Sequence, residues 1–291
     1  MRRHRLQIRV KREFCGTSAI NVAIGRGEFV TRNIRLYIKF AGIVLKSTMQ
    51  YKASFVLQVI GRFILAFNGF VGIFFLFSGI TNIKGYTYGD ILLCFAVMHM
   101  SFYIAECIGS GFKSFEGLIR RGEFDRMMLR PCSLLLQVIG TRFEMGRLGP
   151  MVTAVVTLVL GIQKSSVEWT VAKCFALIGM VIGGVVLFVG LFLIGASICF
   201  FSIADAGIIN VLTYGARDHG KYPMDIYGKG LLKFGTFVIP YTLIQYYPLQ
   251  FLLGRATNVL YALSPLGIVI FAAVCYALWC LGVRNYQSCG N

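Results

Sequence analysis

Three ionisable residues lie within long apolar stretches of this chain, where a charge is costly and is often kept for function. Arg62 lies about nine residues into the first stretch, Glu106 lies about four residues from the end of the second, and His99 precedes Glu106 by seven residues on the same helical face. In a membrane, Arg62 and Glu106 would lie at depths of roughly 13 and 6 Å. The three residues could relay protons or bind a substrate. The alternative is an Arg62–Glu106 ion pair with a structural role. We favour this alternative because a single carboxylate is too few for proton-coupled transport.

A second candidate is a partial phosphate-binding motif. The segment 215–221, Gly-Ala-Arg-Asp-His-Gly-Lys, matches the first seven positions of a P-loop, but Tyr222 replaces the Ser or Thr that binds magnesium and Pro223 blocks the usual helix. We therefore expect no nucleotide site, so any ATP must be bound by another chain. The chain also lacks HExxH and GxSxG motifs, and its three His residues give little support to a membrane hydrolase. We predict that it is not an enzyme and holds no cofactor or metal.

The composition indicates what must position these residues. Of 291 residues, 57% are hydrophobic and only 14% are charged, and the mean hydropathy is +0.72. Soluble domains carry about a quarter charged residues. Apolar runs of about 20 residues predict six transmembrane helices, at residues 53–79, 90–110, 146–162, 171–196, 234–253 and 263–283. The predicted fold is an all-α, polytopic integral membrane protein.

The positions of Lys and Arg predict its orientation. Most of the 29 basic residues fall before residue 53, in 113–147, in 217–233 and at Arg284. The positive-inside rule therefore places these parts and both termini in the cytoplasm. The net charge of +17 is spread over loops, so we expect contact with the headgroups of the lipid bilayer and no binding of nucleic acid.

The N-terminal part divides into two segments. Residues 1–33 form a basic extension without the apolar core of a signal peptide. This extension is either a disordered arm or the product of a misassigned start, with translation beginning at Val30. Residues 34–52 alternate apolar and basic side chains, which predicts an amphipathic helix on the inner membrane surface.

Two apolar segments contain residues that indicate close helix packing or a translocation path. The pattern from Gly179 to Gly195 predicts close helix contacts within the fourth span. Two prolines interrupt the predicted span 234–253 and predict a kinked helix. Its possible path-lining residues are Pro240, Tyr241, Gln245, Tyr247 and Pro248.

A charged island separates the second and third predicted spans. Residues 117–131 contain four Arg, two carboxylates and two Gly, so the island cannot lie in hydrocarbon. Nearby apolar residues Phe112, Phe115, Leu118 and Ile119 form a strip, and Glu116 can pair with Arg120 at i and i+4. We predict a structured cytoplasmic segment, 111–131, in which Gly122 ends a helix.

Several motifs in this order resemble the membrane subunits of ABC-2 type ATP-binding cassette exporters. The resemblance covers about residues 34–290 and rests on 119–125 with 129–131, 222–227, 239–241 with 247–248, and 284–288. The first 33 residues depart from it. The resemblance implies a multi-pass permease in the plasma membrane of a bacterium, which pairs with a second copy or a paralogous permease. ATP and magnesium would be bound by separate ABC ATPase subunits.

In that scheme the island would dock on the ATPase, because mixed-charge segments can set register without burying a large apolar area. The residues assigned to this coupling role are Arg120, Arg121, Gly122, Glu123, Phe124, Asp125, Arg126, Arg130 and Pro131. A headgroup-facing elbow without a partner is the alternative for the island. A secondary transporter that uses Arg62, His99 and Glu106 is the alternative for the whole chain, although no inverted repeat supports it. The sequence does not identify the exported substrate: an amphipathic or drug-like molecule is one candidate, and drug, antibiotic, lipid and peptide export all remain open.

Overall fold

The computed structural model describes residues 42–44, 46–130, 133–202, 207–256 and 258–287. Apart from an isolated bridge between Ile83 and Tyr86, the described residues form helices, turns and loops and no strand. Five helical stretches in this part of the chain are long and apolar enough to cross a membrane: Lys52–Gly79, Tyr88–Arg120, Met145–Lys164, Val171–Ile198 and Val259–Asn285. An all-α polytopic membrane protein is therefore confirmed, but the predicted span 234–253 is not among the five.

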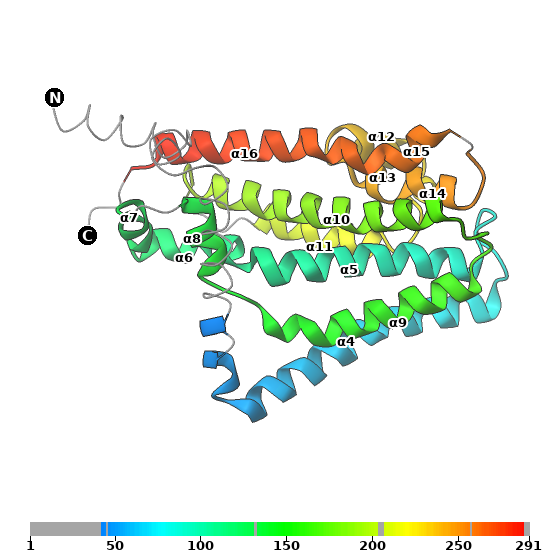
Figure 1. The fold of residues 1–291 in the computed structure, drawn as a ribbon, viewed down its shortest axis with the longest axis horizontal. Coiled ribbons are helices and arrows are strands. Elements are labelled where there is room, and N and C mark those ends of the chain that lie inside the picture. Colours follow the sequence, from blue (N-terminus) through cyan, green and yellow to red (C-terminus); the bar gives the residue numbers. More distant parts are fainter. Residues whose placement is uncertain (1–41, 45, 131–132, 203–206, 257, 288–291) are drawn as a thin grey trace.

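Five long helices lie side by side in one bundle (Figure 1). They are α4 (Lys52–Gly79), α5 (Tyr88–Lys113), α9 (Leu148–Lys164), α10 (Val171–Ile198) and α16 (Ile268–Asn285). Helix α5 is buried along most of its length, with α9 and α10 packed along it. Helix α4 packs mainly on α9 and buries only Ile73 among its described side chains. The side chains of α5 therefore face protein, whereas α4 lies at the edge of the bundle.

The turn before α5 fixes the register of the residues that follow. Lys84 and Gly85 have φ values of 50° and 83°, a left-handed conformation that glycine adopts readily. Thr87 and Asp90 then form a capping box, in which the backbone N–H of Thr87 donates to the Asp90 carboxylate at 2.9 Å. This cap sets where α5 begins and so which of its later residues face the bundle interior.

Small residues bring the helices together, as the glycine pattern of the fourth span predicted. A Cβ atom at Gly184 of α10 would lie 2.4 Å from the Oγ of Ser101 on α5, and one at Gly190 would lie 3.2 Å from the sulfur of Cys275 on α16. These distances leave no room for a side chain without movement of the neighbour, so α10 owes its close packing on both sides to glycine.

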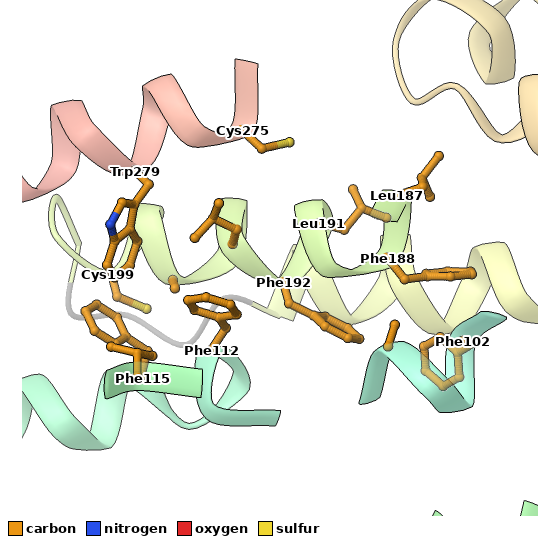
Figure 2. Close-up of a cluster of buried hydrophobic side chains, with 14 of the residues drawn as sticks. Phe102, Phe112, Phe115, Leu187, Phe188, Leu191, Phe192, Cys199, Cys275 and Trp279 are labelled. Atoms are coloured by element: carbon orange, nitrogen blue, oxygen red, sulfur yellow. The ribbon is translucent and has the colours of Figure 1, made fainter. Parts of the chain in front are cut away.

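One end of the bundle, which we call the island end, carries the short helices α6 (Phe115–Arg120), α7 (Glu123–Met128) and α8 (Leu134–Gly140) and the turn η1 (Met145–Arg147). Helices α6 and α7 are joined to the bundle by aromatic packing. Phe112 of α5 and Phe115 of α6 approach Trp279 of α16 with ring centroids 5.9 and 5.2 Å apart (Figure 2). Phe115 also meets Phe124 of α7 at 5.2 Å. The island is thus part of the folded core and not a loose loop.

Helix α11 (Gly207–His219) runs along α5 from the island end toward the opposite end (Figure 1). Its Tyr214 hydroxyl donates to Glu106 near the end of α5, and further along the chain Asp225 accepts a hydrogen bond from Tyr86, which precedes α5. The segment 217–233 was predicted on the same side as the island. In the structure the segment instead lies in the middle and at the opposite end of the bundle, so its cytoplasmic location stays a prediction.

The predicted span 234–253 is wrong as a single helix. It is divided among α12 (Lys229–Phe237), α13 (Tyr241–Ile244) and α14 (Tyr246–Leu252), which gather at the end opposite the island, after the turn η2 (Met224–Tyr227). Pro240 precedes α13 and cannot continue α12 because it lacks an N–H and restricts Ile239. Pro248 lies in the first turn of α14, where a missing N–H costs nothing. The two prolines therefore separate helices where a kink was predicted.

The chain then returns to the bundle through α15 (Val259–Leu263) and the turn η3 (Ser264–Gly267), which lead into α16. Residues 42–44 and 46–49 of the predicted interface helix 34–52 are helical. Residues 50–51 form a turn and Lys52 begins α4, whereas residues 34–41 and 45 of that helix, the extension 1–33 and Pro131 lie outside the described residues.

Candidate functional site

A charged cavity of about 440 Å³ lies between α4, α5, α9 and α11. Its ionisable or polar lining residues are Arg62, Asn68, His99, Tyr103, Arg147, Arg217, Asp218 and Lys221. Arg62 is about 15 Å and Asn68 about 24 Å from the start of α4, a helix about 42 Å long. The cavity thus occupies the middle of the bundle, where four basic side chains converge from α4, η1 and the α11 segment.

Arg62 does not pair with Glu106, contrary to the prediction. Its Nη1 atom donates to Glu144 at 2.7 Å, because α4 packs on α9 and so faces the segment that leads into η1. Glu144 is shared, since Arg142 and Arg147 approach its carboxylate at 3.1 and 3.6 Å. Burial alone would raise the pKa of Glu144, but the hydrogen bond and charge of Arg62, with the charges of Arg147 and Arg142, lower it below the usual value.

Glu106 holds a second ion-pair group at the island side of the cavity. Its side chain is 1% exposed. Lys113 approaches one carboxylate oxygen at 2.6 Å, Arg147 Nε approaches the other at 2.7 Å, and the Tyr214 hydroxyl donates at 2.9 Å. This carboxylate therefore ties α5, η1 and α11 together, and Arg147 connects it with the Glu144 group.

His99 and Arg62 share the cavity, but they make no relay with Glu106. The Nδ1 atom of His99 bonds to the Phe95 carbonyl at 3.0 Å, and its ring stacks on Phe95 with centroids 3.9 Å apart. Glu106 is not among the residues that line the cavity. The structure thus brings together two of the three predicted intramembrane residues and assigns the third to a separate ion-pair group.

Helix α11 contributes the part of the site that the sequence did not predict. Arg217 binds Asp218 through Nε and Nη2 at 3.1 and 3.0 Å, and its guanidinium lies 5.1 Å from the ring centre of Phe102. Lys221 approaches Asp218 less closely, at 3.6 Å. The spacing Arg217, Asp218, Lys221 was visible as part of the partial P-loop. Its meaning was missed because the segment was placed in a cytoplasmic loop, whereas residues 215–219 belong to a helix.

The island forms the second candidate site, at the island end. Phe124 is fully buried, whereas Arg120, Arg121, Arg126 and Arg130 are exposed. Gly122 has a φ of 64° and separates α6 from α7, so the predicted helix break is confirmed. The predicted pair of Glu116 and Arg120 is also present, at 2.5 Å. Glu123 was expected to be available for a partner, but its carboxylate meets Arg121 at 2.8 Å, with 34% of its side chain exposed.

Two of the residues predicted to line a path, Tyr241 and Gln245, contact α11 and the segment that follows it. The buried amide of Gln245 donates to the carbonyls of Gly220 and Tyr222 at 2.7 and 2.8 Å, and the Tyr241 hydroxyl donates to Leu212 at 2.8 Å. Pro240, Tyr241, Gln245, Tyr247 and Pro248 line neither the charged cavity nor an apolar groove of about 500 Å³ between α10, α15 and α16. Their placement supports a structural role at the end opposite the island.

The described residues hold no group of three or more His, Cys, Asp or Glu side chains placed to bind a metal ion. Comparison with known proteins adds one finding. A family model described as "ABC-2 family transporter protein" matches residues 63–290. No curated protein and no solved structure matches the chain.

Proposed function

The chain belongs to the ABC-2 transporter family, and we propose that it is the membrane permease subunit of an ATP-driven exporter whose ATPase is a separate chain. The observation that carries this proposal is the island at one end of the bundle. A buried aromatic base fixes α6 and α7 to α5 and α16, while exposed Arg side chains point away from the core. A displacement of α6 and α7 would therefore be transmitted directly to the long helices α5 and α16.

The exposed chemistry of the island suits a protein partner. Arg120, Arg121, Arg126 and Arg130 are exposed beside Glu123, and Leu129 presents an apolar side chain that is 86% exposed. Mixed charges around an exposed apolar side chain can set the register of a docked protein. Two ABC ATPase subunits, which would supply ATP and magnesium, are the partners that this surface would fit in a permease of this family.

The topology that we propose has six crossings, with α11 and the residues that follow it as the fifth. The island end would be cytoplasmic, and α12, α13 and α14 would lie on the outer side without crossing. Contacts of Lys84 with the carbonyls of Asp225 and Ile226 support this, because residue 84 follows the first crossing. With six crossings both termini remain cytoplasmic, in the plasma membrane of a bacterium.

The edge helix α4 supports a second permease copy or a paralogous permease. Phe63, Ile64 and Leu65 are 37%, 58% and 73% exposed, so α4 offers a long apolar face. Such a face can contact lipid or a second chain. The alternative of a secondary transporter has no observation in its favour, since His99 and Glu106 belong to different groups.

The test is copurification from native membranes. The wild-type chain is expected to recover an ATPase, and Glu123→Lys combined with Asp125→Lys is expected to reduce the recovery at least fivefold, because both changes reverse charges on the island. Glu168→Lys reverses an exposed charge at the opposite end and serves as the control. If the wild-type chain recovers no ATPase, or if the double variant recovers as much as the control, the proposal fails.

A further inference from the structure

The ion pairs in and around the charged cavity hold more positive charge than their carboxylates neutralise. Three carboxylates, Glu106, Glu144 and Asp218, are shared among six basic residues, which are Arg62, Lys113, Arg142, Arg147, Arg217 and Lys221. Of these charged residues, the cavity itself is lined by Arg62, Arg147, Arg217, Asp218 and Lys221. The formal surplus is three positive charges. A surplus at the middle of a bundle that crosses a membrane is costly unless an anion or water compensates it.

The basic groups keep hydrogen-bonding capacity for such an anion. Within the described residues, Arg62 bonds Glu144 through Nη1, although a guanidinium carries five N–H donors. Lys221 is held only loosely, at 3.6 Å from an Asp218 oxygen that also accepts from Arg217. The side chains of Arg62 and Lys221 are 24% and 25% exposed, so solvent or a ligand reaches them.

The shape of the site narrows the class of ligand. A volume of about 440 Å³ suits a small group and not a peptide or a long sugar chain. Arg guanidinium groups match the planar or tetrahedral oxygens of carboxylate and phosphate, and phosphate carries more charge per volume. On the α4 side, Leu65 lines the cavity and is 73% exposed, next to the apolar outer face of that helix. An apolar tail could therefore stay in the bilayer while its headgroup enters the cavity.

From these observations we infer that the cavity binds the phosphoryl headgroup of an amphipathic molecule, with Arg62, Arg217 and Lys221 as the residues that contact it. This inference rests on the proposed function, because it names the class of substrate that the permease would move. Arg147 is the positioning residue, since its guanidinium is held by Glu106 and Glu144.

Equilibrium binding to the purified full chain in a neutral detergent tests the inference. The probes are short-chain phosphatidic acid, the diacylglycerol with the same chains, and inorganic phosphate. Phosphatidic acid is expected to bind at least tenfold more tightly than diacylglycerol, and raised salt is expected to weaken it. Weaker binding of inorganic phosphate is expected, because it would identify a lipid-borne headgroup as the ligand. Binding of inorganic phosphate with equal affinity would identify the free anion as the ligand and would overturn the amphipathic part of the inference.

Arg217→Gln combined with Lys221→Gln is expected to weaken phosphatidic acid binding at least tenfold. Lys229→Gln combined with Lys233→Gln removes the same charge from two exposed positions on α12 and is expected to leave binding unchanged. Arg217→Lys combined with Lys221→Arg keeps the charge and is expected to keep binding, which would show that these two positions tolerate substitution and that the positive charge is what binding requires. Equal binding of diacylglycerol, or equal weakening by both charge-removing variants, would overturn the inference.

Failure here is distinct from failure of the permease proposal, because the binding measurement needs no ATPase. If the wild-type chain recovers its ATPase but shows no preference for phosphatidic acid, only the ligand class is wrong.

Discussion

At the residue scale, Glu106 is the carboxylate on which the interior most depends. Glu106→Gln would leave Lys113 and Arg147 without their shared counter-charge in a buried position, where breaking an ion pair costs about 3 kcal/mol or more. We expect a clear drop in the thermal midpoint of the purified chain, followed by tryptophan fluorescence. Glu116→Gln removes the i, i+4 pair on the island and should cost less than about 0.5 kcal/mol. Equal effects of the two changes would contradict the role given to Glu106.

Glu144 should make the stability of the fold depend on pH, because its pKa is lowered by Arg62 and by the neighbouring Arg147 and Arg142. A carboxyl group with a lowered pKa in the folded state stabilises the fold above its unfolded pKa, about 4.3 for Glu, and this contribution is lost as the pH falls through the folded value. Between pH 6 and pH 3, wild type should therefore lose more thermal stability than Glu144→Gln. Parallel stability curves for the two chains would show that Glu144 is not stabilised by its Arg neighbours.

At the element scale, the contact between α5 and α8 depends on a missing side chain. A Cβ atom at Gly111 would lie 1.9 Å from the carbonyl oxygen of Val138, a backbone atom that cannot rotate away. Gly111→Ala should therefore displace α8, lower the thermal midpoint and weaken ATPase recovery. Gly117→Ala, on α6, meets only the end of the Arg121 side chain at 3.9 Å and should be neutral or stabilising by up to about 1 kcal/mol. A lower thermal midpoint for Gly117→Ala than for Gly111→Ala would contradict this packing.

The elements also show what could be predicted from the sequence. Hydropathy located five long helices because each is a continuous apolar run, and composition identified Gly122 as the break between α6 and α7. Hydropathy did not predict helix α11, and it predicted one continuous span at 234–253 where the structure has several short helices. Helix α11 contains Arg217 and Asp218, which neutralise one another inside the bundle, whereas 234–253 is apolar yet broken by Pro240. A window average cannot register a pairing made in three dimensions.

The same limit applies to the candidate site. Arg62 and His99 were found because each is an ionisable residue within an apolar run. Their neighbours Arg147 and Lys221 come from segments whose sequences resemble ordinary loops. Arg62 pairs with Glu144 and not with Glu106 because α4 packs on α9. Which residues form an ion pair depends on which helices are in contact, and those contacts cannot be inferred from a single sequence.

At the scale of the whole molecule, the two candidate sites lie at different depths along the same helices. The island is attached to α5 and α16 through Phe115 and Trp279, and α5 continues from the island to His99 in the charged cavity. Glu106 lies between them, on α5, and joins η1 and α11. A movement of the island along α5 would therefore change the positions of Arg147 and Tyr214 around Glu106, and it would connect the proposed ATPase on the island with the proposed ligand in the cavity.

The proposed orientation can be tested on intact cells. In a variant that lacks the nine native cysteines, Lys233→Cys should react with a membrane-impermeant maleimide added outside, because α12 lies at the end opposite the island and Lys233 is exposed. Arg126→Cys, on α7, should react only after the cells are permeabilised. The topology inferred from the distribution of Lys and Arg places residue 233 in the cytoplasm, so it predicts that both positions are protected. Protection of Lys233→Cys with labelling after permeabilisation would restore that topology and remove α11 as the fifth crossing.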